Sequence, residues 1–273
     1  MTPTKTPPPP APPAPLARRV QFGKIQTAAG HRIVVYGPGG IGKTTLAASM
    51  PGRTAFFDLD ESLSRLKPQL EESGLLDNIV EVPGIVSWAD LRAALQSEGW
   101  DGVKNIIIDT GTKAEELAMA HTLATVKYGN GQTARSIEDY GYGKGYQYVF
   151  DTFLPLLADL DRHARAGRNV VVVCHDCTTT VPNPMGEDWQ RYEPRLQSPS
   201  SGKASIRLRV REWADHVLFL GYDIAVDKDG KGKGSGTRTL WPVELPHCMA
   251  KSRSTQTEIP IVSGVDVWSQ IIK

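Results

Sequence analysis

The eight consecutive residues 37–44, GPGGIGKT, match the phosphate-binding pattern G-x-x-x-x-G-K-[ST] at every position. The lysine of this motif, Lys43, can reach the β- and γ-phosphates of a nucleotide as a point charge. The hydroxyl of Thr44 is the expected ligand of Mg²⁺, which takes few protein oxygens and keeps several waters. The backbone N–H groups of the loop point inward and add further donors. The predicted nucleotide contacts are Gly37, Pro38, Gly39, Gly40, Ile41, Gly42, Lys43, Thr44 and Thr45.

Acidic residues close two apolar runs downstream of this loop. The run at residues 105–108 ends in Asp109 and predicts a strand buried on both faces, with a carboxylate placed to hold Mg²⁺, usually through water. The run that begins at Thr54 ends in Asp60 and Glu61. In a doubly wound sheet these two acids would lie beside the phosphates, and capping of the next helix is the alternative.

A third apolar run, at residues 169–174, is followed by His175. This histidine would face the same crevice as Asp109 and Lys43. A polar side chain there can hydrogen-bond the γ-phosphate and report its presence to the following loop. A histidine that is simply satisfied within the fold is the alternative.

These side chains require a parallel sheet, because ligands of such sheets bind beyond the carboxyl ends of the strands. The β-branched run at residues 33–36 predicts the strand that enters the loop, and the residues from Lys43 onward open a helix. The predicted fold is α/β, a mostly parallel central sheet flanked by helices, with a C-terminal β-hairpin extension. Further strands are expected at 54–61, 79–82, 105–110, 169–176, 216–226, 237–245 and 258–262, and helices from 62, from 87, at 113–127 and at 146–166.

Length and composition bound the domain organisation. With 273 residues, of which 40% are hydrophobic, the chain can form one sizeable α/β core. Residues 1–17 are dominated by proline and predict a disordered tail, which leaves residues 18–273 as a single domain. Residues 18–31 predict an edge hairpin before the first core strand.

The formal net charge is +1, so any site for a polyanion must be a local patch. No apolar run approaches the roughly 18 residues of a membrane span. We therefore expect a cytoplasmic protein with no membrane partner. An odd number of cysteines, three, suits a compartment that keeps thiols reduced.

Two polar segments are candidates for contact with single-stranded nucleic acid. Residues 128–145 mix glycine, tyrosine and charge, and bases stack on rings such as Tyr140 and Tyr142. Residues 176–205 predict a long polar loop or hairpin, followed by Arg207, Arg209 and Arg211 as a concentration of positive charge. Ordinary solvated loops are the alternative. The turn of the C-terminal hairpin adds Lys228, Lys231 and Lys233.

The order of these elements resembles the RecA-like P-loop ATPase core. The closest resemblance is to the small phage-type ATPases of the AAA family that act as minimal RecA/RadA-like annealing or recombination proteins. It covers roughly residues 30–265. The segments that carry it are GPGGIGKTT and IIIDT, with FFDLDES, GYGKGYQ, VVVVCHD and MAKSRS as weaker matches.

The resemblance implies ATP and Mg²⁺ as ligands and single-stranded DNA as a partner. It also implies a homo-oligomer, ring or filament, and a single-strand-binding or replication protein as a further partner. Asp60 or Glu61 would position the attacking water, and His175 would occupy the sensor position. MAKSRS is similar to the K-x-R element of DnaB-type hexamers, in which Lys251 and Arg253 would act on the γ-phosphate of a neighbouring subunit. A single sheet offers these two cations no obvious internal carboxylate partners.

Three functions follow from this sequence. The first is a DNA-stimulated ATPase that coats or anneals single strands in phage-type recombination. The second is a ring-shaped helicase-type motor or helicase loader, and the third is a non-DNA NTPase switch. Pro38 stands where ParA-type partition ATPases carry lysine, which argues against that class.

Overall fold

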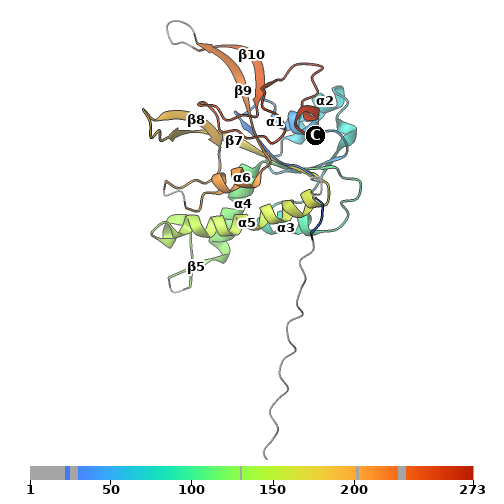
Figure 1. Ribbon diagram of the computed structural model, residues 1–273. Helices are drawn as coiled ribbons and strands as arrows, with labels where there is room; N and C mark the ends of the chain where they lie inside the picture. Colours follow the sequence, from blue (N-terminus) through green and yellow to red (C-terminus); the bar gives the residue numbers. More distant parts are fainter. Residues whose placement is uncertain (1–21, 25–29, 130, 201–202, 227–231, 273) are drawn as a thin grey trace, which may run out of the picture.

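The computed structural model has three layers, a central sheet with helices on both faces (Figure 1). It describes residues 22–24, 30–129, 131–200, 203–226 and 232–272. The predicted tail at 1–17 lies outside the described residues. So do most of the predicted hairpin at 18–31, the residues Lys228 and Lys231, and the side chain of Lys233. No helix of the described part is both long and apolar enough to cross a membrane.

The strands of the sheet are β1 (Arg32–Gly37), β2 (Thr54–Asp58), β3 (Ile79–Glu81), β4 (Asn105–Asp109), β7 (Asn169–Val181), β8 (Trp189–Pro194), β9 (His216–Val226), β10 (Gly232–Trp241) and β11 (Ile259–Pro260). Their spatial order is β11-β10-β9-β1-β7-β4-β2-β3, and β8 pairs with β7 outside this order. The six strands from β9 to β3 run parallel, and β10 and β11 complete the antiparallel C-terminal edge. This confirms the predicted RecA-like α/β class with a C-terminal hairpin.

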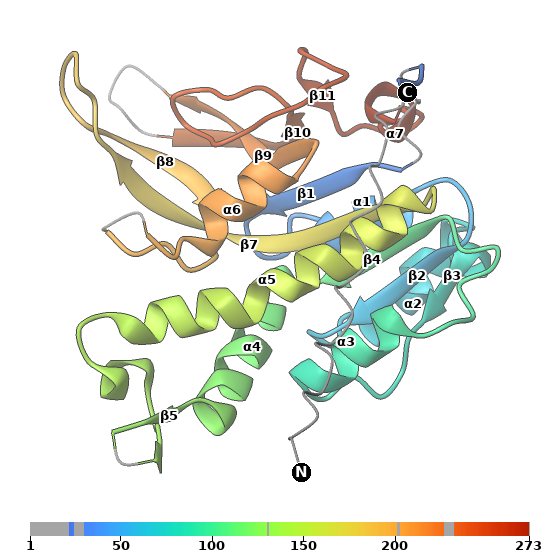
Figure 2. The same cartoon turned by 60° about the horizontal axis from the view of Figure 1, so that its bottom comes forward.

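Helices cover both faces of the sheet (Figure 2). One face packs against α1 (Lys43–Ala48), α2 (Leu63–Glu72) and α7 (Trp268–Ile271), and the other against α3 (Trp88–Gln96), α4 (Gly111–Thr125), α5 (Lys144–Arg165) and α6 (Ile206–Trp213). Alternation along β1 supplies both cores, because Ile33 and Val35 face the first layer while Val34 and Tyr36 face the second. Strands buried on both faces explain the continuous apolar runs in the sequence.

The segment at residues 128–145 is more ordered than a solvated loop. It forms the small hairpin β5 (Lys127–Tyr128) and β6 (Gln132–Thr133) and the 3₁₀ turn η2 (Ile137–Tyr140). The expectation that Tyr140 offers an exposed ring is wrong. Its side chain is buried, and its single hydroxyl hydrogen is within reach of the carbonyl oxygens of Thr122 and Val126, at oxygen–oxygen distances of 3.1 and 2.9 Å.

The segment at residues 176–205 begins as a hairpin, because β7 continues past the sheet edge and pairs with β8. The expected concentration of positive charge after it is largely neutralised, because two of the three arginines have close carboxylate partners. Arg207 donates to Glu193 at 2.6 Å and is mostly buried, and Arg211 pairs with Glu244. Arg209 remains exposed, with a 3.4 Å contact to Glu212.

Candidate nucleotide-binding site

The loop between β1 and α1 needs its glycines for conformation and for close packing. Gly40 and Gly42 have φ angles of 74° and 102°, in the region that side chains other than glycine rarely adopt. A Cβ at Gly37 would lie 2.1 Å from the carbonyl oxygen of Leu220 on β9. The loop can therefore curl tightly against the end of the neighbouring strand.

Lys43 begins α1 and extends its side chain back into this loop, with only 6% of its surface exposed. Its Nζ donates to the carbonyl oxygens of Gly37 and Pro38, each at 2.8 Å. Burial lowers the pKa of this lysine, and the nearby carboxylate of Asp109 opposes that shift. The ammonium group is thus held at the place where the motif predicts the β- and γ-phosphates.

Thr44 and Asp109 meet across the sheet, and the Thr44 hydroxyl donates to Asp109 Oδ2 at 2.6 Å. Burial raises the pKa of Asp109 to about 6, and the hydrogen bond from Thr44 acts in the opposite direction. A hydroxyl and a carboxylate are hard oxygen donors, and Mg²⁺ takes few of them from a protein while waters and phosphate fill the other positions. The two side chains fit the predicted Mg²⁺ site.

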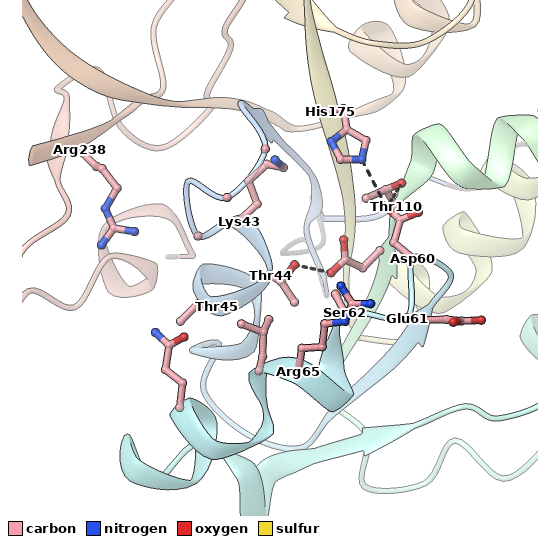
Figure 3. A pocket seen from close by; sticks show the side chains of 16 residues that line it. Lys43, Thr44, Thr45, Asp60, Glu61, Ser62, Arg65, Thr110, His175 and Arg238 are labelled. Atoms are coloured by element: carbon pink, nitrogen blue, oxygen red, sulfur yellow. Dashed lines mark hydrogen bonds and ion pairs between the residues drawn. The ribbon is translucent and has the colours of Figure 1, made fainter. Parts of the chain in front are cut away.

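The acids at the end of β2 separate into different roles. Asp58 accepts hydrogen bonds from the backbone of Ser62 and Leu63, so it supplies the helix cap that was the alternative for its neighbours. Asp60 accepts a hydrogen bond from the Thr110 hydroxyl at 3.0 Å. Glu61 also lines the cavity, but its side chain is exposed and is directed away from Lys43 and Thr44 in Figure 3.

His175 lies beside Asp60, with its Nε2 3.4 Å from Asp60 Oδ2 (Figure 3). The strand order explains this placement, because β7 lies between β1 and β4. In the register of the sheet, His175 is level with Gly37, and Asp109 is level with Val173. The carboxyl ends of these strands therefore bring the predicted residues to one edge.

These residues line a cavity of about 470 Å³. The structure thus brings together Lys43, Thr44, Asp60, Asp109 and His175, which are far apart in sequence, with Glu61 at the wall. Sequence reasoning missed several other lining residues: Ser62, Arg65, Leu66, Gln69, Thr110 and Arg238. The first four lie at the start of α2 and within it, directly after the acids at residues 58–61. That closeness in sequence to the acids could have identified them. No local pattern marks Arg238.

Lys251 and Arg253 lie elsewhere in the same chain. Lys251 pairs with Val217 near the start of β9, at the amino end of the parallel strands, and its Nζ donates to the carbonyls of Glu212 and Ala214. Arg253 lies 3.0 Å from Asp215. The expectation that a single sheet offers no carboxylate partner is wrong for Arg253, whereas the partners of Lys251 are backbone carbonyls. Neither residue lines the cavity.

The strand order, the loop and the cavity define a RecA-like P-loop nucleotide-binding protein. A family model described as "AAA domain" matches residues 29–254, and the chain belongs to that family. No curated protein matches its sequence.

Two solved structures show distant similarity. A KaiC-like protein from the hyperthermophilic archaeon Pyrococcus horikoshii OT3 is 14% identical in sequence. The match covers 85% of this chain and 85% of that chain, with a TM-score of 0.46. The RadB recombinase is 15% identical, with 78% of this chain and 80% of that chain covered and a TM-score of 0.44.

Proposed function

We propose that this protein hydrolyses ATP and acts on single-stranded DNA in phage-type recombination or annealing. The observation that carries the ATPase assignment is that one and the same cavity is lined by Lys43, by the pair Thr44 and Asp109, and by a second carboxylate, Asp60. Residues 18–273 would form one ATPase domain.

Each side chain has a defined task in this reaction. Lys43 binds the β- and γ-phosphates, and Thr44 with Asp109 would hold Mg²⁺, which neutralises negative charge on those phosphates when bound. Asp60 orients the attacking water, since Thr110 and His175 fix its carboxylate at the wall of the cavity. His175 contacts the terminal phosphate from the side of β7.

The route from ATP to DNA would run along β7. The buried half of this strand ends at His175, and its outer half forms the hairpin with β8. A change in the contacts of His175 on hydrolysis would therefore act directly on that hairpin.

The proposed DNA surface is an exposed aromatic and cationic segment, Tyr142, Lys144 and Tyr146. Tyr142 is fully exposed. The side chain of Gln197 donates to the carbonyl oxygen of Tyr146 at 2.9 Å, which joins this segment to the residues that follow β8. Rings that stack on bases, with a lysine for phosphate, suit single-stranded DNA.

Combining Tyr142→Ala with Lys144→Glu is expected to weaken single-stranded DNA binding by tenfold or more, on the order of one lost stacking contact and one lost charge. The slope of log K against log salt should shrink by roughly 0.7 for the lost phosphate contact. Fluorescence anisotropy with a labelled oligonucleotide at several salt concentrations measures both quantities.

Lys67→Glu is the matched control for Lys144→Glu, because Lys67 is an exposed residue of α2 and its substitution changes the charge by the same amount. Unchanged affinity in the double variant would remove this segment from the DNA surface, and no measurable DNA binding by the wild-type protein would favour the non-DNA switch. Strand displacement driven by ATP in the wild-type protein would favour the helicase-type motor or loader.

We further propose a homo-oligomer in which Arg253 acts on the ATP of a neighbouring subunit. Its side chain is 68% exposed despite the contact to Asp215, and it lies at the amino end of the sheet. Head-to-tail packing would bring that end against the carboxyl-end cavity of the next subunit. Lys251, held by backbone carbonyls, would support the segment.

Mixing Arg253→Ala subunits with Lys43→Ala subunits is expected to restore ATPase activity that neither variant shows alone. At a mixed interface, the Lys43→Ala subunit supplies its intact Arg253 to the intact loop of the other. A trans-acting arginine contributes a factor of about 10³ to 10⁵ to turnover. Wild-type turnover by the Arg253→Ala variant on its own would contradict the shared site. Turnover by wild-type protein that remains monomeric in sedimentation would contradict it as well.

A further inference from the structure

Arg238 reaches the phosphate-binding loop from the C-terminal hairpin. Its backbone is fixed in the sheet, because it pairs with Tyr222 of β9 and its carbonyl accepts a hydrogen bond from the N–H of Ile261 at 2.8 Å. The register of β10 shifts just before this residue, which is typical of a bulge that redirects a side chain. Since Tyr36 of β1 is level with Phe219 of β9, the hairpin extends Arg238 past the end of β1.

The side chain of Arg238 packs directly against the loop. It shares a strand face with Leu240, two residues further on, which is buried in the core beside α1. Its Nη1 donates to the carbonyl oxygen of Ile41 at 2.6 Å. A Cβ at Gly42 would lie 2.6 Å from the same nitrogen, so the glycine leaves room for the guanidinium group.

Among the described residues, Arg238 has no carboxylate partner, unlike Arg207 with Glu193 and Arg253 with Asp215. A guanidinium carries five N–H donors. The bond to Ile41 uses one nitrogen, so most of the donor capacity of Arg238 is left at the wall of the cavity. An arginine in this state is suited to phosphate, which it binds with a planar, charged fork.

The position of Arg238 selects the end of the nucleotide that it can bind. Asp60 and His175 lie on one side of Lys43 in Figure 3, and Arg238 lies on the other. In the proposed site, Thr44, Asp109 and Asp60 would hold the γ-phosphate on the first side. The side of Arg238 would then be left for the α-phosphate and the nucleoside.

We propose that Arg238 is a nucleotide-binding residue supplied in cis by β10, and that its guanidinium group binds the α-phosphate of ATP and ADP. The inference rests on the proposed nucleotide site. Since the α-phosphate has the same charge before and after hydrolysis, Arg238 stabilises substrate and transition state alike. It contributes to affinity, whereas an arginine at the γ-phosphate would contribute to turnover.

The test is Arg238→Gln, because a glutamine amide can still donate to the carbonyl of Ile41 while the charge is lost. We expect the Kd of ADP and the KM for ATP to rise by roughly tenfold to a hundredfold, as for one charge-assisted hydrogen bond. The kcat should stay within about threefold of wild type. The affinity for magnesium pyrophosphate, which has no nucleoside end, should not change.

Arg238→Lys should recover part of the ADP affinity, and Arg53→Ala, which removes an exposed arginine outside the cavity, should leave it unchanged. An equal loss of pyrophosphate and ADP affinity would show that Arg238 only shapes the loop. A lower kcat with unchanged Kd would place Arg238 at the γ-phosphate. Either result overturns the inference. The Lys43→Ala variant distinguishes a failure of this inference from a failure of the proposed nucleotide site. Normal nucleotide binding by Lys43→Ala would reject the site itself.

Discussion

Replacing Lys43 with alanine is expected to abolish ATP hydrolysis and to weaken nucleotide binding strongly. The substitution removes a buried cation that the loop holds against its own carbonyls, at the place predicted for the β- and γ-phosphates. Charge-assisted bonds to phosphate are among the strongest in such sites, and removing one donor to developing charge typically costs about 10²- to 10³-fold in turnover. Phosphate release and binding of a fluorescent ATP analogue measure the two losses.

The fold should survive this substitution, because the Lys43 side chain belongs to the wall of the cavity and to neither hydrophobic core. An unchanged circular dichroism spectrum is the control. Wild-type turnover in Lys43→Ala would remove Lys43 from the site.

The second large effect is expected for Asp60→Asn, which should leave ATP binding intact and lower kcat by about 10²- to 10⁴-fold. Positioning a water matters mainly in the transition state, so affinity for the ground state is preserved. Single-turnover hydrolysis beside equilibrium ATP binding separates the two quantities. Asp109→Ala should behave differently and lower the Mg²⁺-dependent affinity, because it removes the carboxylate beside Thr44.

Glu61→Gln is the matched control for Asp60→Asn, since Glu61 is the neighbouring acid and its exposed side chain is directed away from Lys43 and Thr44 in Figure 3. We expect it to hydrolyse ATP at close to the wild-type rate. If Asp60→Asn is fully active while Glu61→Gln is slow, the two roles are reversed. If both variants are fully active, neither acid positions the water.

The local chemistry of the site could be predicted from sequence because each part lies in a short, continuous pattern. The loop motif fixes Lys43 and Thr44, and an isoleucine run that ends in an acid fixes Asp109. Parallel strands then place their carboxyl ends at one edge, which predicts the meeting of Asp109 with His175. Strand β9 even has the predicted bounds, His216–Val226.

The errors arise where long-range contacts decide the role of a side chain. Tyr140 is buried by its packing on α4, and Arg207 is neutralised by Glu193 on β8, although both segments are polar in sequence. Arg238 contacts Ile41 across 197 residues, and only the pairing of β10 with β9 brings it there. Composition identifies rings and charges, but tertiary pairing determines which of them are free.

The most direct test of the proposed function is the rate of phosphate release from ATP by this protein, with and without single-stranded DNA. Lys43→Ala protein purified in parallel supplies the background rate. We predict Mg²⁺-dependent turnover well above this background and a further increase when single-stranded DNA is added. Turnover that is no faster than that of Lys43→Ala under both conditions would contradict the proposal.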